Sequence, residues 1–164
     1  MKVVILAGGY GTRLSEYTDT IPKPMVPIGG IPIIEHIMTL YSYYGHKDFY
    51  IALGYKGQII KDYFKNSKKD WKINLIDTGS DTLTGGRLKR LEKYLEQETF
   101  LLTYGDGISN ININNLIEFH KNHKKLITIS AVRPPARFGS LSLEDDNVIK
   151  FKEKKQLGES WING

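Results

Sequence analysis

The chain has 164 residues, of which 40% are hydrophobic and 25% charged, as in an ordinary globular protein. This length fits one domain that can bury a sizeable core. Cysteine is absent, which excludes disulfides and thiolate metal sites and is typical of a reducing cytoplasm. The apolar run at residues 3–6 is short and meets glycines at once, so it predicts neither a signal peptide nor a membrane span.

The net charge is +5, from 23 Lys and Arg against 18 Asp and Glu. Such an excess favours polyanionic partners, which include nucleotides, nucleic acids and lipid head groups. The densest basic run is residues 61–72, which we interpret as a solvated helix end and loop. No array of aromatic residues runs through it, as a single-strand nucleic-acid surface usually requires. We therefore expect neither a nucleic-acid partner nor a membrane.

Apolar runs and helical periods alternate along the chain. The expected strands are residues 2–6, 48–53, 73–76, 100–103 and 127–132, and the expected helices are residues 32–44, 57–64, 87–95 and 113–123. Gly45 is expected to end the first helix as a left-handed residue. Residues 140–143 and 148–151 predict a hairpin around 145–147, and a further strand is expected to begin at 161–164. Alternating strands and helices predict an α/β, Rossmann-like fold, with a mostly parallel sheet and helices on both faces.

Ligands of such sheets bind beyond the carboxyl ends of the strands. After the first strand, Gly8, Gly9 and Gly11 let the backbone turn tightly and present its N–H groups to an anion. Leu14 stands where a dinucleotide fingerprint needs its third glycine, and no Walker sequence follows. Arg13 adds a planar fork that can hold two phosphate oxygens. The pattern indicates a phosphate-binding loop, although a plain tight turn would also explain it.

Two further positions suit phosphate chemistry. Lys23 lies between Pro22 and Pro24, which restrict the backbone and are expected to prevent a helix there. A lysine fixed in this way can present a compact positive charge to a phosphoryl group. Asp106 follows the strand at 100–103 between two glycines, and a carboxylate at that place suits Mg²⁺. Taken alone, Lys23 is better explained as an exposed lysine in a proline-rich loop, and Asp106 is explained equally well as an acidic turn residue.

Together these segments resemble the sugar-1-phosphate nucleotidyltransferases. The resemblance rests on residues 6–14, followed by Pro22-Lys23-Pro24-Met25. Further segments are similar to the glucose-1-phosphate cytidylyltransferase branch, namely residues 28–30, 35–38, 47–49, 54–57, 77–79, 84–90, 103–107 and 137–139. The likeness covers nearly the whole chain and implies a fold of the nucleotide-diphospho-sugar transferase type.

The resemblance implies a cytoplasmic, Mg²⁺-dependent enzyme that joins CTP and glucose 1-phosphate into CDP-glucose and pyrophosphate, and that is a homo-oligomer at full length. The reaction is an in-line attack on the α-phosphorus, in which the protein positions reactants and offsets charge. The resemblance assigns catalysis to Arg13, Lys23 and Asp106, with Asp106 as the metal ligand. The implied nucleotide-binding residues are Leu6, Ala7, Gly8, Gly9, Tyr10, Gly11, Thr12, Arg13, Lys23, Thr82, Arg87 and Gly105.

Two of the implied roles have alternatives. Arg87 is expected to contact the nucleotide, but it could instead brace the start of a helix. Lys154 is the expected sugar-phosphate ligand, in a segment where Lys155 replaces the family's proline; it could also be a solvated hairpin residue. The histidines at 36, 46, 120 and 123 lack metal-ligand spacing, and we expect each of them to be hydrogen-bonded or exposed.

The sequence departs from the family pattern in two places. Residues 65–75 form a shorter bridge than cytidylyltransferases carry, and the family continues beyond 161–164 into another strand, sugar contacts and a second metal-binding aspartate. We therefore expect residues 1–164 to be a nucleotidyltransferase catalytic domain, truncated before the last strands and C-terminal helices. Such a chain is expected to bind CTP with weakened turnover.

Other functions stay open at this point. A sibling enzyme that uses dTTP, UTP or GTP would share the loop, the lysine and the aspartate. A non-catalytic nucleotide-binding module would bind without chemistry. A dinucleotide-dependent oxidoreductase is disfavoured by Leu14, and a nucleic-acid binder rests on net charge alone.

Overall fold

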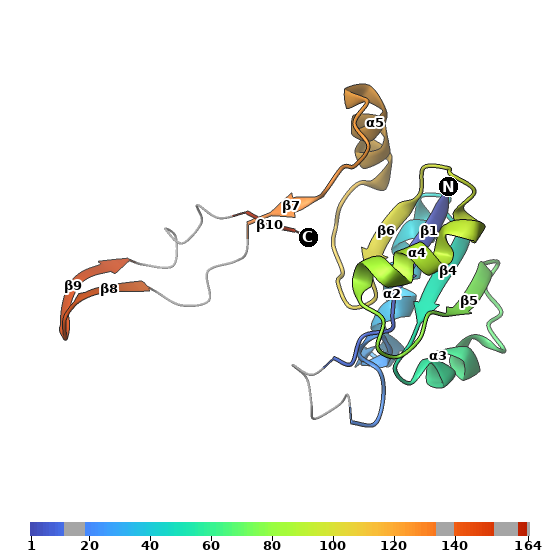
Figure 1. Cartoon of the computed structure of the whole chain (residues 1–164), viewed down its shortest axis with the longest axis horizontal. Coiled ribbons are helices and arrows are strands. Elements are labelled where there is room, and N and C mark those ends of the chain that lie inside the picture. Colours follow the sequence, from blue (N-terminus) through green and yellow to red (C-terminus); the bar gives the residue numbers. More distant parts are fainter. Residues whose placement is uncertain (12–18, 134–139, 153–160, 164) are drawn as a thin grey trace. The chain divides into compact units, whose positions relative to one another are not determined.

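The computed structural model describes residues 1–11, 19–133, 140–152 and 161–163. The chain divides into two compact units, residues 1–113 and residues 114–164 (Figure 1). Among the described residues, no helix combines the length and the apolar character that crossing a membrane requires.

The first unit is built on four parallel strands, β1 (Lys2–Leu6), β4 (Asp48–Leu53), β5 (Lys72–Asp77) and β6 (Leu101–Tyr104). Their order across the sheet is β5-β4-β1-β6. Leu6 pairs with Ala52 on one side and Tyr104 on the other, so the strand ends lie level. The arrows in Figure 1 point the same way, which brings the loops after all four strands to one edge. The expected α/β fold with a mostly parallel sheet is confirmed.

Helices cover both faces of this sheet. Side chains of β1 alternate between the faces, and Val3, Val4 and Ile5 are all fully buried, so each face needs a cover. On one face Leu91 and Leu95 of α4 (Thr84–Leu95) pack against Val4 and its neighbours on β4. On the other side lies α2 (Ile33–Tyr43), behind the sheet in Figure 1. The helix α3 (Gly57–Phe64) packs against β5.

The segment between β1 and α2 differs from expectation. A short 3-10 helix, η2 (Lys23–Met25), forms where the two prolines were expected to prevent any helix. The amide of Met25 donates to Pro22 O (2.8 Å), and the amide of Val26 donates to Lys23 O (3.1 Å). Pro24 is tolerated because it stands in the first turn, where a helix needs no N–H donor and where the fixed φ of proline fits.

A small hairpin follows η2 and was not expected. Its strands are β2 (Pro27–Ile28) and β3 (Ile31–Pro32), joined by Gly29 and Gly30. Both glycines have positive φ, 59° and 83°. A two-residue hairpin turn with positive φ at both positions favours glycine, and no alternation of hydrophobic residues announces strands this short. The hairpin leads directly into α2, and Gly45 ends that helix with φ 84°, as expected.

The helices and strands of the first unit otherwise lie within a few residues of their expected places. Helix α4 begins at Thr84, three residues earlier than expected, because it includes Gly85 and Gly86. Strand β6 is shifted by one residue, and β5 is longer by one residue at each end.

The second unit contains α5, β7, β8, β9 and β10. The helix α5 (Ile113–His123) begins at the last residue of the first unit. The expected hairpin is confirmed as β8 (Ser140–Glu144) and β9 (Asn147–Lys152), with Asp145 in the turn at φ 52°. The expected strand at 127–132 is wrong in extent, because only β7 (Ala131–Val132) forms. Its described partner, β10 (Ile162–Asn163), offers two residues for pairing.

Candidate functional site

The loops that follow the four parallel strands are joined to one another at the carboxyl edge of the sheet. Backbone hydrogen bonds run from Ala7 N to Ala52 O (3.0 Å), from Tyr55 N to Gly8 O (3.2 Å), from Thr78 N to Leu53 O (2.9 Å) and from Gly105 N to Leu6 O (2.9 Å). Every parallel strand therefore delivers its loop into one connected backbone framework. Open α/β sheets bind their ligands at this edge.

The glycine loop begins buried and turns outward. Gly8 is buried and Gly9 is exposed, with open space where a side chain would stand. Gly11 has φ 69°, a conformation that favours glycine. The ring of Tyr10 lies 5.0 Å from that of Tyr55, and its hydroxyl donates to Asp81. This hydrogen bond raises the pKa of Tyr10 and fastens the loop to the segment that precedes α4.

Lys23 and Asp106 form an ion pair across the same edge. Lys23 comes from η2, and Asp106 comes directly after β6. A side chain on Gly105 would lie 2.9 Å from Pro24 Cγ, so the absence of one lets η2 pack closely on the loop after β6. Both charged groups keep about three-tenths of their side-chain surface exposed. A ligand can therefore reach either group and replace its partner in the ion pair without unfolding of the surrounding structure.

Arg87 lies in the first turn of α4 and is 4% exposed. Its guanidinium donates to Leu53 O (3.1 Å), Thr78 Oγ1 (2.8 Å), Gly79 O (2.7 Å), Gly8 O (2.8 Å) and Ser80 O (3.0 Å). Burial lowers the pKa of Arg87, yet an arginine side chain stays charged at neutral pH. The group thus joins the loops after β1, β4 and β5.

Thr82 also faces a cation in the structure. Its hydroxyl accepts from Arg90 Nη1 (2.7 Å), and the same nitrogen donates to Thr78 O. Thr78 is fully buried, and its hydroxyl donates to Leu53 O (2.6 Å). The segment between β5 and α4 is therefore held by two arginines from the helix that it precedes.

The structure brings together most of the residues expected at the site. Leu6 to Gly11, Lys23, Thr82, Arg87, Gly105 and Asp106 all lie in the first unit, on η2, at the end of β1 or in the segments that follow the sheet. Thr12, Arg13 and Lys154 lie outside the described residues. That these residues bind nucleotide or sugar phosphate stays a prediction.

Sequence reasoning missed Thr78, Arg90 and Gly54. Gly54 follows β4, and a side chain there would overlap the Arg87 guanidinium and lie 2.6 Å from Gly8 O. The segment 54–57 contributed to the family resemblance, and that was the signal available for Gly54. Arg90 lies one turn after Arg87 on α4, a spacing that marks a shared helix face but gives no target for the side chain.

The carboxylate of Asp106 stands without a cluster of other metal ligands. Among the described residues, no group of three or more His, Cys, Asp and Glu side chains could hold a metal ion. Mg²⁺ does not require one, because it is bound by one or two carboxylates together with waters and substrate phosphate oxygens. A single partly exposed aspartate meets that requirement.

All four histidines meet the expectation of a hydrogen-bonded or exposed side chain. His36 Nε2 lies 3.0 Å from Ile28 O, and His120 and His123 both contact Thr128 Oγ1, at 2.8 Å and 2.6 Å. His46 Nδ1 lies 3.4 Å from the N-terminal amine of Met1, whereas its buried Nε2 has no partner in the described part of the chain. Burial accordingly lowers the pKa of His46.

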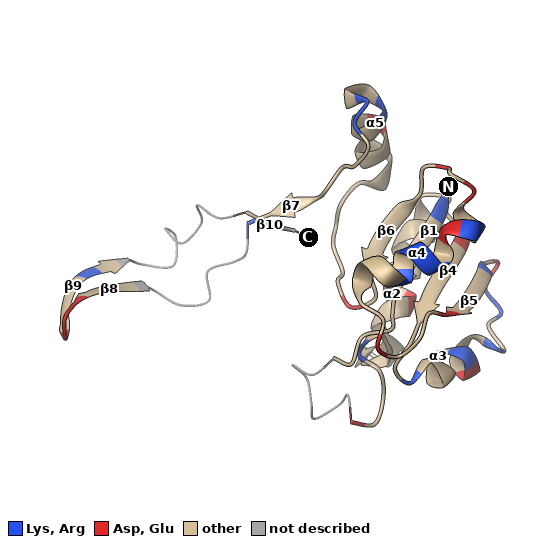
Figure 2. Ribbon diagram, in the orientation of Figure 1, with Lys and Arg blue, Asp and Glu red and all other residues tan. Residues whose placement is uncertain are grey.

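Acidic side chains lie close to the lysines of the basic run at residues 61–72. Figure 2 shows Lys and Arg together with Asp and Glu on α3 and α4. Lys69 lies 3.8 Å from Glu35, and Lys72 lies 3.2 Å from Asp48. This agrees with the interpretation of the run as a solvated helix end.

Comparison with protein families matches residues 2–162 to the family described as nucleotidyl transferase. The chain belongs to the nucleotidyl transferase family. It is 46% identical to the glucose-1-phosphate cytidylyltransferase of Salmonella typhi, over 187 residues that include all of this chain and 73% of that protein. It is also 34% identical to a D-glycero-alpha-D-manno-heptose 1-phosphate guanylyltransferase of Campylobacter jejuni, over 166 residues, all of this chain and 73% of that protein.

A solved structure shares the fold. HddC from Yersinia pseudotuberculosis, in a complex with GMP-PN, is 33% identical and superposes with a TM-score of 0.71 over 99% of this chain and 73% of its own. The glycine loop and the Lys23–Asp106 pair of this chain thus lie on a fold that HddC shares.

Proposed function

We propose that this protein transfers a cytidylyl group from CTP to glucose 1-phosphate, giving CDP-glucose and pyrophosphate. The observation that carries the proposal is the Lys23–Asp106 pair beside an exposed glycine loop, at the carboxyl edge of a parallel sheet. The choice of CTP and glucose 1-phosphate follows the 46% identity to the Salmonella typhi enzyme. The identity to the cytidylyltransferase is higher than the 34% identity to the guanylyltransferase, and this favours cytidine as the base.

The residues of this edge divide the work of positioning and charge neutralisation. Backbone N–H groups of the Gly8–Gly11 segment would hold phosphate oxygens, and Arg13 would add its fork at the pyrophosphate end. Lys23 would release Asp106 and meet the charge that develops at the α-phosphate when a phosphate oxygen of the sugar attacks and the bond to the β-phosphate breaks. Thr82 and Gly105 would border the nucleotide. Lys154 would contact the sugar phosphate.

Mg²⁺ is part of the proposal, with Asp106 as its protein ligand. The ion would supply charge neutralisation along the triphosphate. In the ligand-free protein Lys23 neutralises the Asp106 carboxylate. A cation at Asp106 would free Lys23 for the nucleotide, so nucleotide and metal should each strengthen the binding of the other.

The proposal is tested by pyrophosphate release from the purified chain with Mg²⁺, glucose 1-phosphate and each of CTP, GTP, UTP, dTTP and ATP. Release confined to CTP supports it, and release with GTP alone would instead support the guanylyl branch. The comparison between CTP and GTP matters because identity and length favour different relatives. The alignment with the cytidylyltransferase spans 187 residues, 23 more than the 164 of this chain. The alignment with the guanylyltransferase spans 166 residues, so in length this chain agrees better with the guanylyltransferase.

Binding of the same nucleotides, followed by calorimetry, separates recognition from turnover. CTP that binds without pyrophosphate release would reject the transfer reaction for this chain and retain nucleotide recognition. No binding by any nucleotide would reject both. Inclusion of a metal chelator should weaken CTP binding if Asp106 holds Mg²⁺, and unchanged binding would remove the metal from the proposal.

A further inference from the structure

The buried side chain of Arg87 contacts the glycine loop from the interior of the protein, through Gly8 O. All five of its hydrogen-bond acceptors are oxygens of the protein, and four of them are backbone carbonyls. Within the described residues no carboxylate forms an ion pair with it. Because Arg87 as a whole residue is only 4% exposed, its side chain has little surface left for a ligand. Any effect of Arg87 on a nucleotide must therefore pass through the groups that it holds.

The space that the guanidinium occupies is created by two glycines. A side chain on Gly8 would overlap the Arg87 guanidinium, and so would one on Gly54. Both glycines belong to loops of the carboxyl edge, after β1 and after β4. The cation is thus inserted between these loops, and the loops are shaped around it.

The carbonyl of Gly8 determines the direction of the next amide. It accepts from Arg87 Nη2 (2.8 Å) and from Tyr55 N (3.2 Å), so it points into the protein. In a trans peptide the C=O and the following N–H point in opposite directions. The N–H of Gly9 therefore points away from Arg87, and Gly9 is exposed with open space beside it.

Hydrogen bonds to a carbonyl also polarise the peptide that carries it. A charged donor on Gly8 O draws electrons toward that oxygen and makes the Gly9 N–H a stronger donor. Orientation and polarisation act in the same sense, because both favour an anion on the exposed side of the loop. Neither requires contact between Arg87 and the ligand.

We propose that Arg87 is a positioning residue that turns the Gly9 N–H toward the phosphates of the nucleotide and strengthens it as a donor. This inference rests on the proposed function for the identity of the anion. It replaces a direct contact of Arg87 with the nucleotide by an action through the Gly8–Gly9 peptide.

The test is made first on the free protein, by nuclear magnetic resonance of the chain labelled with ¹⁵N at glycine. In Arg87→Lys the ammonium cannot reproduce the planar fork, so the Gly9 amide resonance should move in the absence of any ligand. Lys89→Ala is the matched control, because it removes a cation from an exposed position of the same helix. It should leave the Gly9 resonance in place.

Binding of CTP and of inorganic triphosphate is then measured by calorimetry. Loss of a charge-assisted hydrogen bond predicts an affinity about 10–100-fold lower in Arg87→Lys. Arg87→Ala with added guanidinium ion is the second variant, and the ion should restore both the Gly9 resonance and the affinity. Thermal melting establishes that each variant is folded before it is compared.

An affinity that falls while the free Gly9 resonance stays unchanged would overturn the proposal in favour of direct contact. Unchanged affinity in folded Arg87→Lys would overturn it as well. Wild-type protein that binds no nucleotide or triphosphate, but whose Gly9 resonance depends on Arg87, would instead refute the proposed function while upholding the positioning of the peptide.

Discussion

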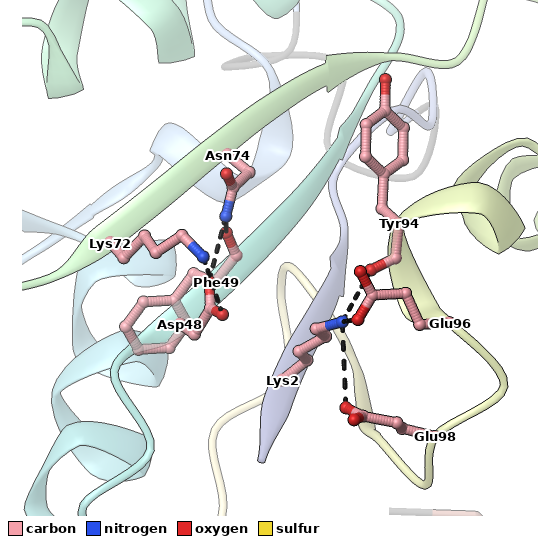
Figure 3. Close-up of polar contacts among 8 residues, drawn as sticks. All are labelled: Lys2, Asp48, Phe49, Lys72, Asn74, Tyr94, Glu96 and Glu98. Carbon is pink, nitrogen blue, oxygen red and sulfur yellow. Dashed lines mark hydrogen bonds and ion pairs between the residues drawn. The ribbon is translucent and has the colours of Figure 1, made fainter.

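The two edges of the parallel sheet treat charge in different ways. At the amino edge, Lys2 Nζ lies 2.8 Å from Glu96 and 3.8 Å from Glu98, and it donates to Tyr94 O (2.9 Å) (Figure 3). Lys72, on β5 at the same edge, pairs with Asp48 on β4. At the carboxyl edge, Arg87 meets carbonyl and hydroxyl oxygens, and the Gly9 amide faces open space.

The two edges differ in the charged groups and backbone N–H donors that remain available to a ligand. The amino edge borders an open hollow of about 460 Å³, but its lining residues carry both signs of charge. Lys2 and Lys72 meet carboxylates, as the dashed lines in Figure 3 show, and Lys47 pairs with Asp70. At the carboxyl edge Arg87 is buried with no carboxylate partner among the described residues, and the exposed Gly9 amide and the partly exposed Lys23–Asp106 pair are accessible. A hollow is thus a poorer guide to a site than unbalanced charge and exposed backbone donors.

The largest expected effect is on catalysis at the carboxyl edge. Removal of a group that neutralises transition-state charge predicts that Lys23→Ala and Asp106→Ala each lower the rate of pyrophosphate release about 10²–10³-fold. The measurement is the initial rate with CTP, Mg²⁺ and glucose 1-phosphate. Lys72→Ala breaks the corresponding kind of ion pair at the amino edge and should retain the wild-type rate. A comparable loss in Lys72→Ala would abolish the distinction between the edges.

A second effect is on stability. In Gly54→Ala the new methyl group would overlap Arg87 and crowd Gly8 O, which predicts a loss of about 1–3 kcal/mol in the free energy of unfolding. Gly85→Ala is the control, because nothing lies within 4 Å of the added carbon in α4. Alanine favours a helix interior over glycine by up to about 1 kcal/mol, so this variant should be neutral or more stable. Urea unfolding curves of the two variants should therefore move in opposite directions, or only the first should move.

A smaller effect is expected from the outer fastening of the glycine loop. Tyr10→Phe removes the hydroxyl that donates to Asp81 but keeps the ring beside Tyr55. Loss of one hydrogen bond of this kind predicts CTP affinity lower by about 3–10-fold. Tyr43→Phe removes an exposed hydroxyl from α2 and serves as the control. Equal affinities in the two variants would show that the loop is held without Tyr10.

The smallest effect is expected at the amino edge, where exposed ion pairs contribute little. The bond from Lys2 holds the pKa of Glu96 below its ordinary value of 4.5. A depressed carboxyl pKa stabilises the fold above the unfolded value, and this contribution disappears as pH falls through the folded value. Glu96→Gln removes the carboxylate charge but keeps the bond from Lys2 to Tyr94 O, so it should melt slightly earlier than wild type at neutral pH and low salt. The difference should vanish in high salt and at acidic pH, and a difference that persists in both would contradict an exposed ion pair.

Pattern alone predicted the alternating strands and helices, because burial on both faces of a parallel sheet imposes continuous apolar strands such as Val3–Ile5. The glycine loop, Lys23 and Asp106 each had a plain structural explanation when taken alone, and it was their order along the chain, through the family resemblance, that marked them. Pattern did not predict the extent of β7, which depends on how many residues β10 offers for pairing. Nor did it predict the 3-10 turn at Lys23, where hydrogen bonds from Met25 and Val26 act against the expected effect of two prolines.

The sequence by itself determined the family, the sheet and the residue types available for phosphate chemistry, because these depend on periodicity and on short ordered motifs. Only the tertiary structure decided what Arg87 does. Its five acceptors come from segments as far apart in the chain as Gly8 and Ser80, and nothing local to α4 distinguishes it from an exposed arginine. Parallel packing of β1, β4 and β5 brings those carbonyls to one point, and the buried cation satisfies them there.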